Sequence, residues 1–407
     1  MIPFWRVIPR FDREYSLGSL LYALRGLAKG SQPTTGDLHK AFAPARLYFL
    51  RSGREGLYVL LKVLGLPPRS RVGVQLYCCM AVFEAIAAAG HIPVFLDVDL
   101  ETYGLDHESL RRNKDRLDAL VVVHTFGYPA DLDGIRACLE GRRIPIIEDC
   151  AHSVLSEYHD RLTGTLTEAS FFSFGVHKPA ATGGGGMIVV NQPALVERAE
   201  QEVGALRVGA ASEELRHAVG TWLRSLAYCR LLYGILMASP LGRWRDVDRG
   251  DPEAKAAEAL GASWSPAGVR RVNHTLVEGR LRGFEAKLSR LAENSRKLRK
   301  LAENAPLAVP PDPAWGKWNY FMLPVRYPTA QQRDAGRSYL RSRGLDTCAL
   351  YQNCERNARL FGYLSGCPQA EEAARTICTV PNHSWLAQTD IDYIGRCLRE
   401  SVEPRRD

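Results

Sequence analysis

Residues Ile146–Asn191 read IIEDCAHSVLSEYHDRLTGTLTEASFFSFGVHKPAATGGGGMIVVN, and this stretch decides the fold. This stretch and the two residues before it contain three short apolar runs of the kind that forms buried strands: Ile144–Cys150, Ala169–Phe174 and Met187–Val190. The first run ends close to Asp149, and the second leads through Ser173 to Lys178. A carboxylate, a hydroxyl and an amine therefore follow predicted strands, which is where ligands bind in α/β sheets.

The same alternation of strand and helix patterns extends toward the N-terminus. Three more apolar runs are predicted strands: Val72–Tyr77, Ile92–Val98 and Ala119–Phe126. Helix patterns lie before and between the strands, at Glu55–Leu64, Met80–Ala89, Glu108–Leu117 and Leu132–Leu139. Alternation of this kind predicts right-handed crossovers and a mostly parallel sheet between helices, in an α/β fold.

The alternation stops near Leu206, and the rest of the chain predicts a second domain. A charged helical pattern over Thr275–Asn304 is followed by a strand pattern and two helix patterns, at Asn319–Val325, Gln331–Arg343 and Thr389–Ser401. We expect a large α/β domain at residues 1–265, with an N-terminal arm and an apolar insertion near 205–262. A smaller α+β domain is expected at residues 266–407.

Composition narrows the function classes. The 407 residues carry 53 Lys+Arg and 45 Asp+Glu, a formal net charge of +8. Basic residues over 278–300 alternate with glutamates, which is typical of a solvated helix face, so we expect no nucleic-acid partner. Ten cysteines without a C-x-x-C pair lack the usual zinc and thioredoxin spacings. We therefore expect no metal and a reducing, cytoplasmic location.

The most apolar stretch is Leu223–Trp244, which arginines interrupt. Its longest uncharged run, Leu231–Gly242, has 12 residues, whereas a membrane-spanning helix needs about 20. We interpret the stretch as a buried or interface helix, and a helix on a membrane surface is the alternative.

The residues after the strands have one economical chemical interpretation, a pyridoxal-phosphate site. Lys178 would form a Schiff base with the cofactor aldehyde, and Asp149, 29 residues earlier, would hold the pyridine nitrogen protonated. The Ser173 hydroxyl would join backbone N–H groups around the phosphate. A helix start at Arg51–Arg54 could supply those N–H groups and a favourable dipole.

At this point the sequence resembles the DegT/StrS-type sugar aminotransferases, which have the aspartate-aminotransferase fold. Three segments carry the resemblance besides Ile146–Asn191: SGREGL at Ser52–Leu57, AGHIPVFLDVDLETYGLD at Ala89–Asp106 and VVVHTFGYPADLDGI at Val121–Ile135. The resemblance implies Lys178 as the Schiff-base lysine and proton-transfer group, with Asp149 on the pyridine nitrogen. It implies that the other cofactor contacts come from His152, Ser173, Ser52, Gly53 and Arg54.

Three departures from the family pattern stand out. The family places an aromatic residue over the cofactor ring where this chain has Cys78 and Cys79, so we expect the contact with the ring to come from Cys79, from Tyr77 or from elsewhere. Arg54 replaces a threonine, so it either binds the phosphate as a charged fork or blocks the loop. The family's N-x-R element, which reaches the partner subunit, is not found near Gly261–Ser265.

The expected activity is transfer of an amino group from an amino acid, such as glutamate, to a keto-sugar that is nucleotide-linked. The resemblance also implies a homodimer with each site at the subunit interface. Two alternatives remain: a relative that has lost transamination and has a binding or regulatory role, and one that runs dehydration. His124 is either a cleft residue or a structural histidine.

Overall fold

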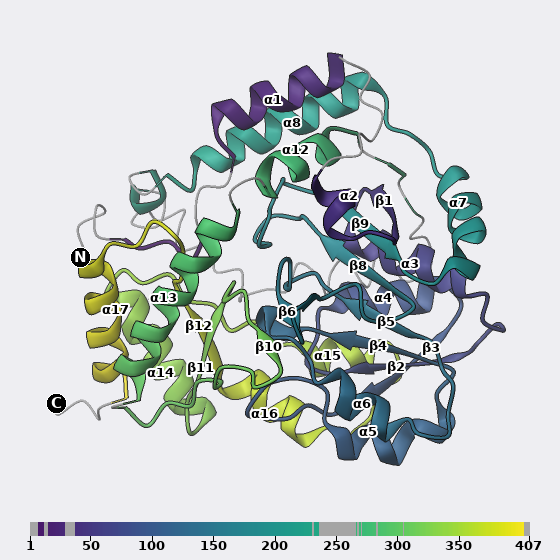
Figure 1. The fold of residues 1–407 in the computed structure, drawn as a ribbon. Coiled ribbons are helices and arrows are strands. Elements are labelled where there is room, and N and C mark those ends of the chain that lie inside the picture. The colour runs from purple at the N-terminus through teal and green to yellow at the C-terminus, as the bar shows by residue number, and fades with distance from the viewer. Residues whose placement is uncertain are drawn as a thin grey trace.

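The computed structural model describes residues 7–11, 15–28, 37–229, 232–235, 266, 268–269, 271–281, 284–303 and 305–402. A seven-stranded sheet forms its centre (Figure 1). From one edge to the other its strands are β1 (Arg46–Leu50), β9 (Gly186–Val190), β8 (Ala169–Ser173), β5 (Ile146–Asp149), β4 (Ala119–Val123), β2 (Arg71–Gln75) and β3 (Ile92–Leu96).

Five neighbouring strands, β3, β2, β4, β5 and β8, run parallel, and β9 is antiparallel to both β8 and β1. This confirms the predicted mostly parallel sheet and α/β fold. This arrangement also places the carboxyl ends of β1, β2, β4, β5 and β8 on the same side of the sheet. Loops that follow these strands can therefore meet at a single site.

Both faces of the sheet are apolar and covered, as β4 illustrates. All five residues of its ALVVV sequence are buried. Alternate side chains enter two different cores: Ala119, Val121 and Val123 join one, and Leu120 and Val122 join the other. Period-two alternation between two apolar cores is what a central parallel strand requires.

Four helices of the large domain lie close to the predicted bounds. They are α3 (Gly53–Leu64), α4 (Met80–Ala88), α5 (His107–Asn113) and α6 (Leu132–Cys138). Side chains of α3 and α4 belong to the first core, and those of α5 and α6 to the second. Ser52 caps α3 at its start, and Gly65 ends it in the left-handed conformation at φ 63°.

The remaining elements surround this centre. The helices are α1 (Leu17–Ala28), α2 (Asp37–Ala41), α7 (Val196–Gly204), α8 (Ala211–Leu226), α12 (Arg271–Leu281), α13 (Phe284–Ala302), α14 (Ala330–Ser342), α15 (Cys354–Arg359), α16 (Pro368–Thr376) and α17 (Gln388–Glu400). Two small antiparallel sheets contain β6 (Glu157–Tyr158), β7 (Arg161–Leu162) and β10 (Gly316–Lys317), and β11 (Leu323–Arg326) and β12 (Ile377–Val380).

The N-terminal segment is tied to a distant part of the chain. Ile8 pairs with Leu345, and the Arg10 guanidinium forms two hydrogen bonds of 2.9 and 2.7 Å with the carboxylate of Asp346. Helices α1, α8 and α12 pack together beside the sheet, so the segment after residue 265 first returns to the N-terminal helices (Figure 1). The domain division at residue 265 stays a prediction.

Part of the predicted apolar stretch is described. Helix α8 includes its first four residues, and residues 232–235 are helical. Residues 230–231 and 236–244 lie outside the described residues, as do Gly261–Ser265 and most of the predicted insertion beyond 235. Within the described ranges, no helix is both long and apolar enough to cross a membrane.

Candidate active site

Asp149 occupies the centre of the site, at the carboxyl end of β5. Its side chain is 4% exposed, and its Oδ1 accepts a hydrogen bond of 2.9 Å from the Ala151 amide. Burial raises the pKa of this carboxyl, while the Ala151 hydrogen bond and the charge of Lys178 act in the opposite direction. A buried carboxylate of this kind favours a cationic partner.

Lys178 lies in the loop that follows β8 and is half-buried. After burial, its charge lowers the pKa of His152, and it also acts to lower the pKa values of Asp149 and Cys78. The Lys178 ammonium therefore lies within electrostatic range of all three side chains. The structure therefore brings together the lysine and the aspartate that are separated by 29 residues in sequence. His177, the residue before Lys178, stacks on Phe11 and not on a group of the site, with the two ring centroids 4.5 Å apart.

His152 lies beside this pair and has an unsatisfied ring nitrogen. The residue is 4% exposed, and its Nδ1 has no hydrogen-bond partner in the part of the chain that the structure describes. Burial, and then the charge of Lys178, lower the pKa of His152 well below its ordinary value, so the imidazole is neutral at pH 7. A buried polar atom without a protein partner is able to bind a polar atom of a ligand.

Ser52, Gly53 and Ser173 lie together where α3 begins. The Ser52 hydroxyl accepts a hydrogen bond of 3.2 Å from the Glu55 amide. A Cβ atom at Gly53 would lie 2.9 Å from the Cβ of Ser173, so only glycine lets the helix start approach the end of β8 this closely. The positive end of the α3 dipole, beside the Ser52 and Ser173 side chains, makes this corner suitable for a phosphate.

Arg54, also predicted to contact the cofactor, lies nearby with its charge already paired. Its guanidinium forms a salt bridge of 2.9 Å with Glu84, a residue of α4 that is 6% exposed. This pair joins the first turn of α3 to α4. The sequence left open whether Arg54 binds phosphate or blocks the loop, and the structure adds this third arrangement.

The two cysteines after β2 border the site without offering a ring to it. Cys79 is half-buried and precedes the first residue of α4. Cys78 is buried, and burial, followed by the charge of Asp149, raises the pKa of its thiol well above the ordinary value. Cys78 therefore stays a neutral thiol at pH 7.

A buried cluster of His124, Glu148 and Cys150 has the composition of a metal site. His124 Nδ1 accepts a hydrogen bond of 3.0 Å from the Ala130 amide, so its Nε2 carries the proton and donates to Glu148 at 3.1 Å. Glu148 also accepts from the Gly164 amide at 2.8 Å and from other donors of the same loop. These atoms are already used within the protein, so His124 is a structural histidine.

The residues present fit pyridoxal phosphate. Asp149 is a buried carboxylate for a pyridine nitrogen, and His152 Nδ1 needs a partner. Ser173 and the start of α3 form a corner with hydroxyl and N–H donors. Lys178 interacts electrostatically with both Asp149 and His152.

One residue of the site has no signal in the sequence. Tyr351, near the start of α15, has its ring parallel to that of His152, with an interplanar angle of 6° and centroids 6.2 Å apart. It belongs to no recognisable motif and follows Asp149 by about 200 residues. Only the packing of the C-terminal elements against the sheet could reveal it.

Comparisons with known proteins show which proteins this chain is similar to. Residues 47–222 match the model of the DegT/DnrJ/EryC1/StrS aminotransferase family. GDP-perosamine synthase of Escherichia coli O157:H7 is 32% identical over 148 residues, which cover 36% of this chain and 41% of the synthase. That alignment therefore spans less than half of the relative.

Two further comparisons extend over most of the chain. A pleiotropic regulatory protein of Geobacillus stearothermophilus is 25% identical over 356 residues, covering 86% of this chain and 83% of that protein. The crystal structure of the aminotransferase TlmJ from Streptoalloteichus hindustanus superimposes with a TM-score of 0.74 at 24% identity. It covers 97% of this chain and 99% of TlmJ, which shows that the two share a fold.

Proposed function

We propose that the chain, whose residues 47–222 belong to the DegT/DnrJ/EryC1/StrS aminotransferase family, is a pyridoxal-phosphate-dependent sugar aminotransferase. The observation that carries this proposal is the meeting of Lys178, Asp149 and His152 at one edge of the sheet. The amino donor would be an amino acid, for which we propose glutamate. The acceptor would be a keto-sugar, for which we propose a nucleotide-linked form.

When bound, pyridoxal phosphate supplies an aldehyde that reacts with amines and a ring that accepts electrons from the donor's α-carbon. Asp149 would hold a proton on the ring nitrogen, because a buried carboxylate is stabilised by a cation at hydrogen-bond distance. Lys178 would hold the cofactor and, once released, would take the proton from the donor's α-carbon. His152, neutral in the site, would bind a polar atom of the cofactor.

The phosphate would be bound by the corner between α3 and β8. The hydroxyls of Ser52 and Ser173 and the N–H groups of the first turn of α3 are suited to an anion. Gly53 permits the close approach on which this corner depends. Arg54 would contribute indirectly, since its pairing with Glu84 fixes the first turn of α3 against α4.

Charge and cysteine content support the finer parts of the proposal. The net charge of +8 favours a phosphate-bearing sugar substrate over a neutral one. None of the ten cysteines is in a disulfide in the structure, as a reducing cytoplasm would keep them. A homodimer is proposed from the family resemblance.

A second candidate is a family member with a regulatory role. The long alignment with a protein named as a pleiotropic regulator favours it, as do the missing aromatic at Cys79 and the pairing of Arg54 with Glu84. Such a protein could retain Lys178 and Asp149 without catalysing transfer. A test must therefore measure amino transfer itself and not only cofactor binding.

The test is a half-reaction in single turnover. The purified holoenzyme is mixed with glutamate, glutamine or alanine. The absorbance spectrum then shows whether the visible band of the cofactor is replaced by the near-ultraviolet band of its amine form. Conversion with one donor, reversed by a nucleotide-linked keto-sugar, is the expected result. A holoprotein that converts with no donor would contradict the aminotransferase proposal and favour the regulatory one.

Lys178→Ala is the variant for this test, and Lys62→Ala is the matched control. Lys62 is an exposed lysine of α3 in the same domain. The first variant should lose conversion and the second should retain it. Release of water from the sugar without incorporation of nitrogen, detected by mass spectrometry, would indicate dehydration instead.

A further inference from the structure

The cofactor pocket proposed above lacks an aromatic residue at its usual sequence position. The residues after β2 are Cys78, which is buried, and Cys79, which precedes α4. Neither can stack on a flat heteroaromatic ring. Such rings gain affinity from parallel or edge contacts with aromatic side chains, so the pocket needs another source of π surface.

Tyr351 lies where it could supply that surface. Its ring is within 6° of parallel to the His152 ring, and its hydroxyl is 3.4 Å from His152 Nε2. Its pKa is raised well above the ordinary value by burial, and then by Cys79, Cys78 and Asp149, which therefore lie around it. Tyr351 thus faces both the cysteines that replace the usual aromatic and the carboxylate at the centre of the site.

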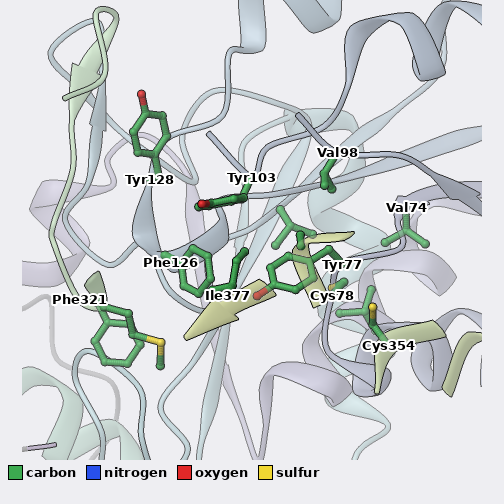
Figure 2. Close-up of a cluster of buried hydrophobic side chains, with 14 of the residues drawn as sticks. Val74, Tyr77, Cys78, Val98, Tyr103, Phe126, Tyr128, Phe321, Cys354 and Ile377 are labelled. Carbon is green, nitrogen blue, oxygen red and sulfur yellow. The ribbon is translucent and has the colours of Figure 1, made fainter. Parts of the chain in front are cut away.

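Two contacts from Tyr77 hold Tyr351 in position. The hydroxyl of Tyr77 donates a hydrogen bond of 2.9 Å to the carbonyl of Leu350, and the Tyr77 ring meets the Tyr351 ring edge-on at 5.3 Å. Figure 2 shows Tyr77 among buried side chains that include Phe126 and Cys354.

The backbone gives a second, independent indication. Tyr351 has φ 57°, in the left-handed region that a bulky residue rarely occupies. A non-glycine residue persists there only where its surroundings determine the conformation, and such residues cluster at functional sites. The strained backbone directs this ring toward His152 and not away from it.

The hydroxyl of Tyr351 has a consequence for His152. Because Tyr351 stays protonated at neutral pH, it can donate toward Nε2 of the neutral His152 ring. The imidazole proton then resides on Nδ1, the buried atom without a partner in the described residues. His152 would therefore present an N–H donor to the site, suited to an oxygen that carries negative charge.

We propose that Tyr351, from the C-terminal part of the chain, forms the aromatic wall of the cofactor pocket that residues 78 and 79 lack. Its hydroxyl orients His152 so that Nδ1 donates to an oxygen of the cofactor. This inference rests on the proposed function, because it assumes that pyridoxal phosphate is the ligand. It makes Tyr351 a cofactor contact through its ring and a positioning residue through its hydroxyl.

The test measures cofactor affinity and the visible spectrum, not turnover. Apoprotein is titrated with pyridoxal phosphate, and the dissociation constant is obtained for the wild type, Tyr351→Phe, Tyr351→Leu and Tyr351→Ala. Loss of the ring in the last two should weaken binding by about tenfold or more. Tyr351→Phe should bind within about threefold of the wild type and shift the pH dependence of the visible band.

A rescue variant and a control separate this role from a structural one. Cys79→Phe in the Tyr351→Ala background should recover most of the lost affinity, since it restores an aromatic at the family position. Trp385→Ala, at a residue that is 76% exposed, should change nothing. Thermal melting of each apoprotein checks folding, and Tyr351→Leu keeps most of the side-chain volume if Tyr351→Ala does not fold.

The outcomes distinguish the two proposals. Wild-type protein that does not bind pyridoxal phosphate would overturn the proposed function. Wild-type protein that binds it, with Tyr351→Leu and Tyr351→Ala binding equally well, would overturn the inference about Tyr351 alone. The inference would also fail if Tyr351→Phe lost as much affinity as Tyr351→Ala, or if Cys79→Phe gave no rescue.

Discussion

Replacing Glu148 by glutamine should strongly destabilise the protein. The side chain is fully buried, and each of its oxygens has its own donors. Oε1 accepts from the Leu166 amide at 2.9 Å and from the Thr167 amide and hydroxyl at 3.1 and 3.2 Å. Oε2 accepts from the Gly164 amide at 2.8 Å and from His124 Nε2 at 3.1 Å. Glutamine has the same shape but only one acceptor oxygen.

The loss of stability is calculated for the more favourable of the two orientations that the glutamine side-chain amide can take. If the glutamine oxygen keeps the three donors, its NH₂ group faces the N–H groups of Gly164 and His124. His124 cannot respond by moving its proton, because its Nδ1 accepts from the Ala130 amide. Two buried donors lose their acceptor, at about 1–3 kcal/mol each, so Glu148→Gln should lower the free energy of unfolding by about 2–6 kcal/mol.

Urea unfolding followed by circular dichroism measures this difference. The control is Glu108→Gln, because the Glu108 side chain is 59% exposed and contacts only neighbouring arginines of α5, so the change should stay within about 0.5 kcal/mol. A Glu148→Gln protein as stable as the Glu108→Gln protein would refute the structural role assigned to this network.

Three further results are expected. Gly53→Ala should destabilise the protein by about 1–3 kcal/mol and weaken cofactor binding, because the new Cβ would meet Ser173. Gly220→Ala, where the new Cβ would lie in open space on α8, should leave the stability unchanged or raise it. Equal changes in stability for the two variants would contradict the close approach at Gly53. Burial acts to raise the pKa of Asp346, but the charge and hydrogen bonds of Arg10 hold it below the ordinary value, so the pair stabilises the fold above about pH 4 and this contribution is lost as the pH falls. Asp346→Asn should cost about 3–5 kcal/mol at pH 7 and flatten the acid limb of the stability profile, and an unchanged acid limb would contradict this. Excess EDTA should alter neither the melting temperature nor the cofactor affinity, because the ring nitrogens of His124 already form hydrogen bonds with Ala130 and Glu148. A clear drop in melting temperature would indicate a bound metal.

Apolar patterning was sufficient to predict the centre of the fold. Six strands and four helices of the large domain lie within a few residues of the predicted bounds, because buried parallel strands are continuous apolar runs. Strand β1 was missed, since only two of its five residues are buried at the sheet edge. The two-residue strands β6, β7 and β10 are too short to leave a pattern.

Some residues of the site could be predicted from local sequence patterns and others could not. Asp149 and Ser173 end strands, so local patterning placed them at one edge of the sheet, and Lys178 follows in the next loop. The partner of Arg54 and the position of Tyr351 depend on tertiary packing. Neither contact has a local sequence signal, because each joins segments that only the complete fold brings together.

The most direct test of the account is to locate the covalent bond to the cofactor. Holoprotein is reduced with borohydride, digested and mapped by mass spectrometry. The account predicts that the visible band is bleached and that the phosphopyridoxyl group is found on Lys178, and on no residue in Lys178→Ala protein. A colourless protein that gains no band with added pyridoxal phosphate, or a modification at another lysine, would contradict it.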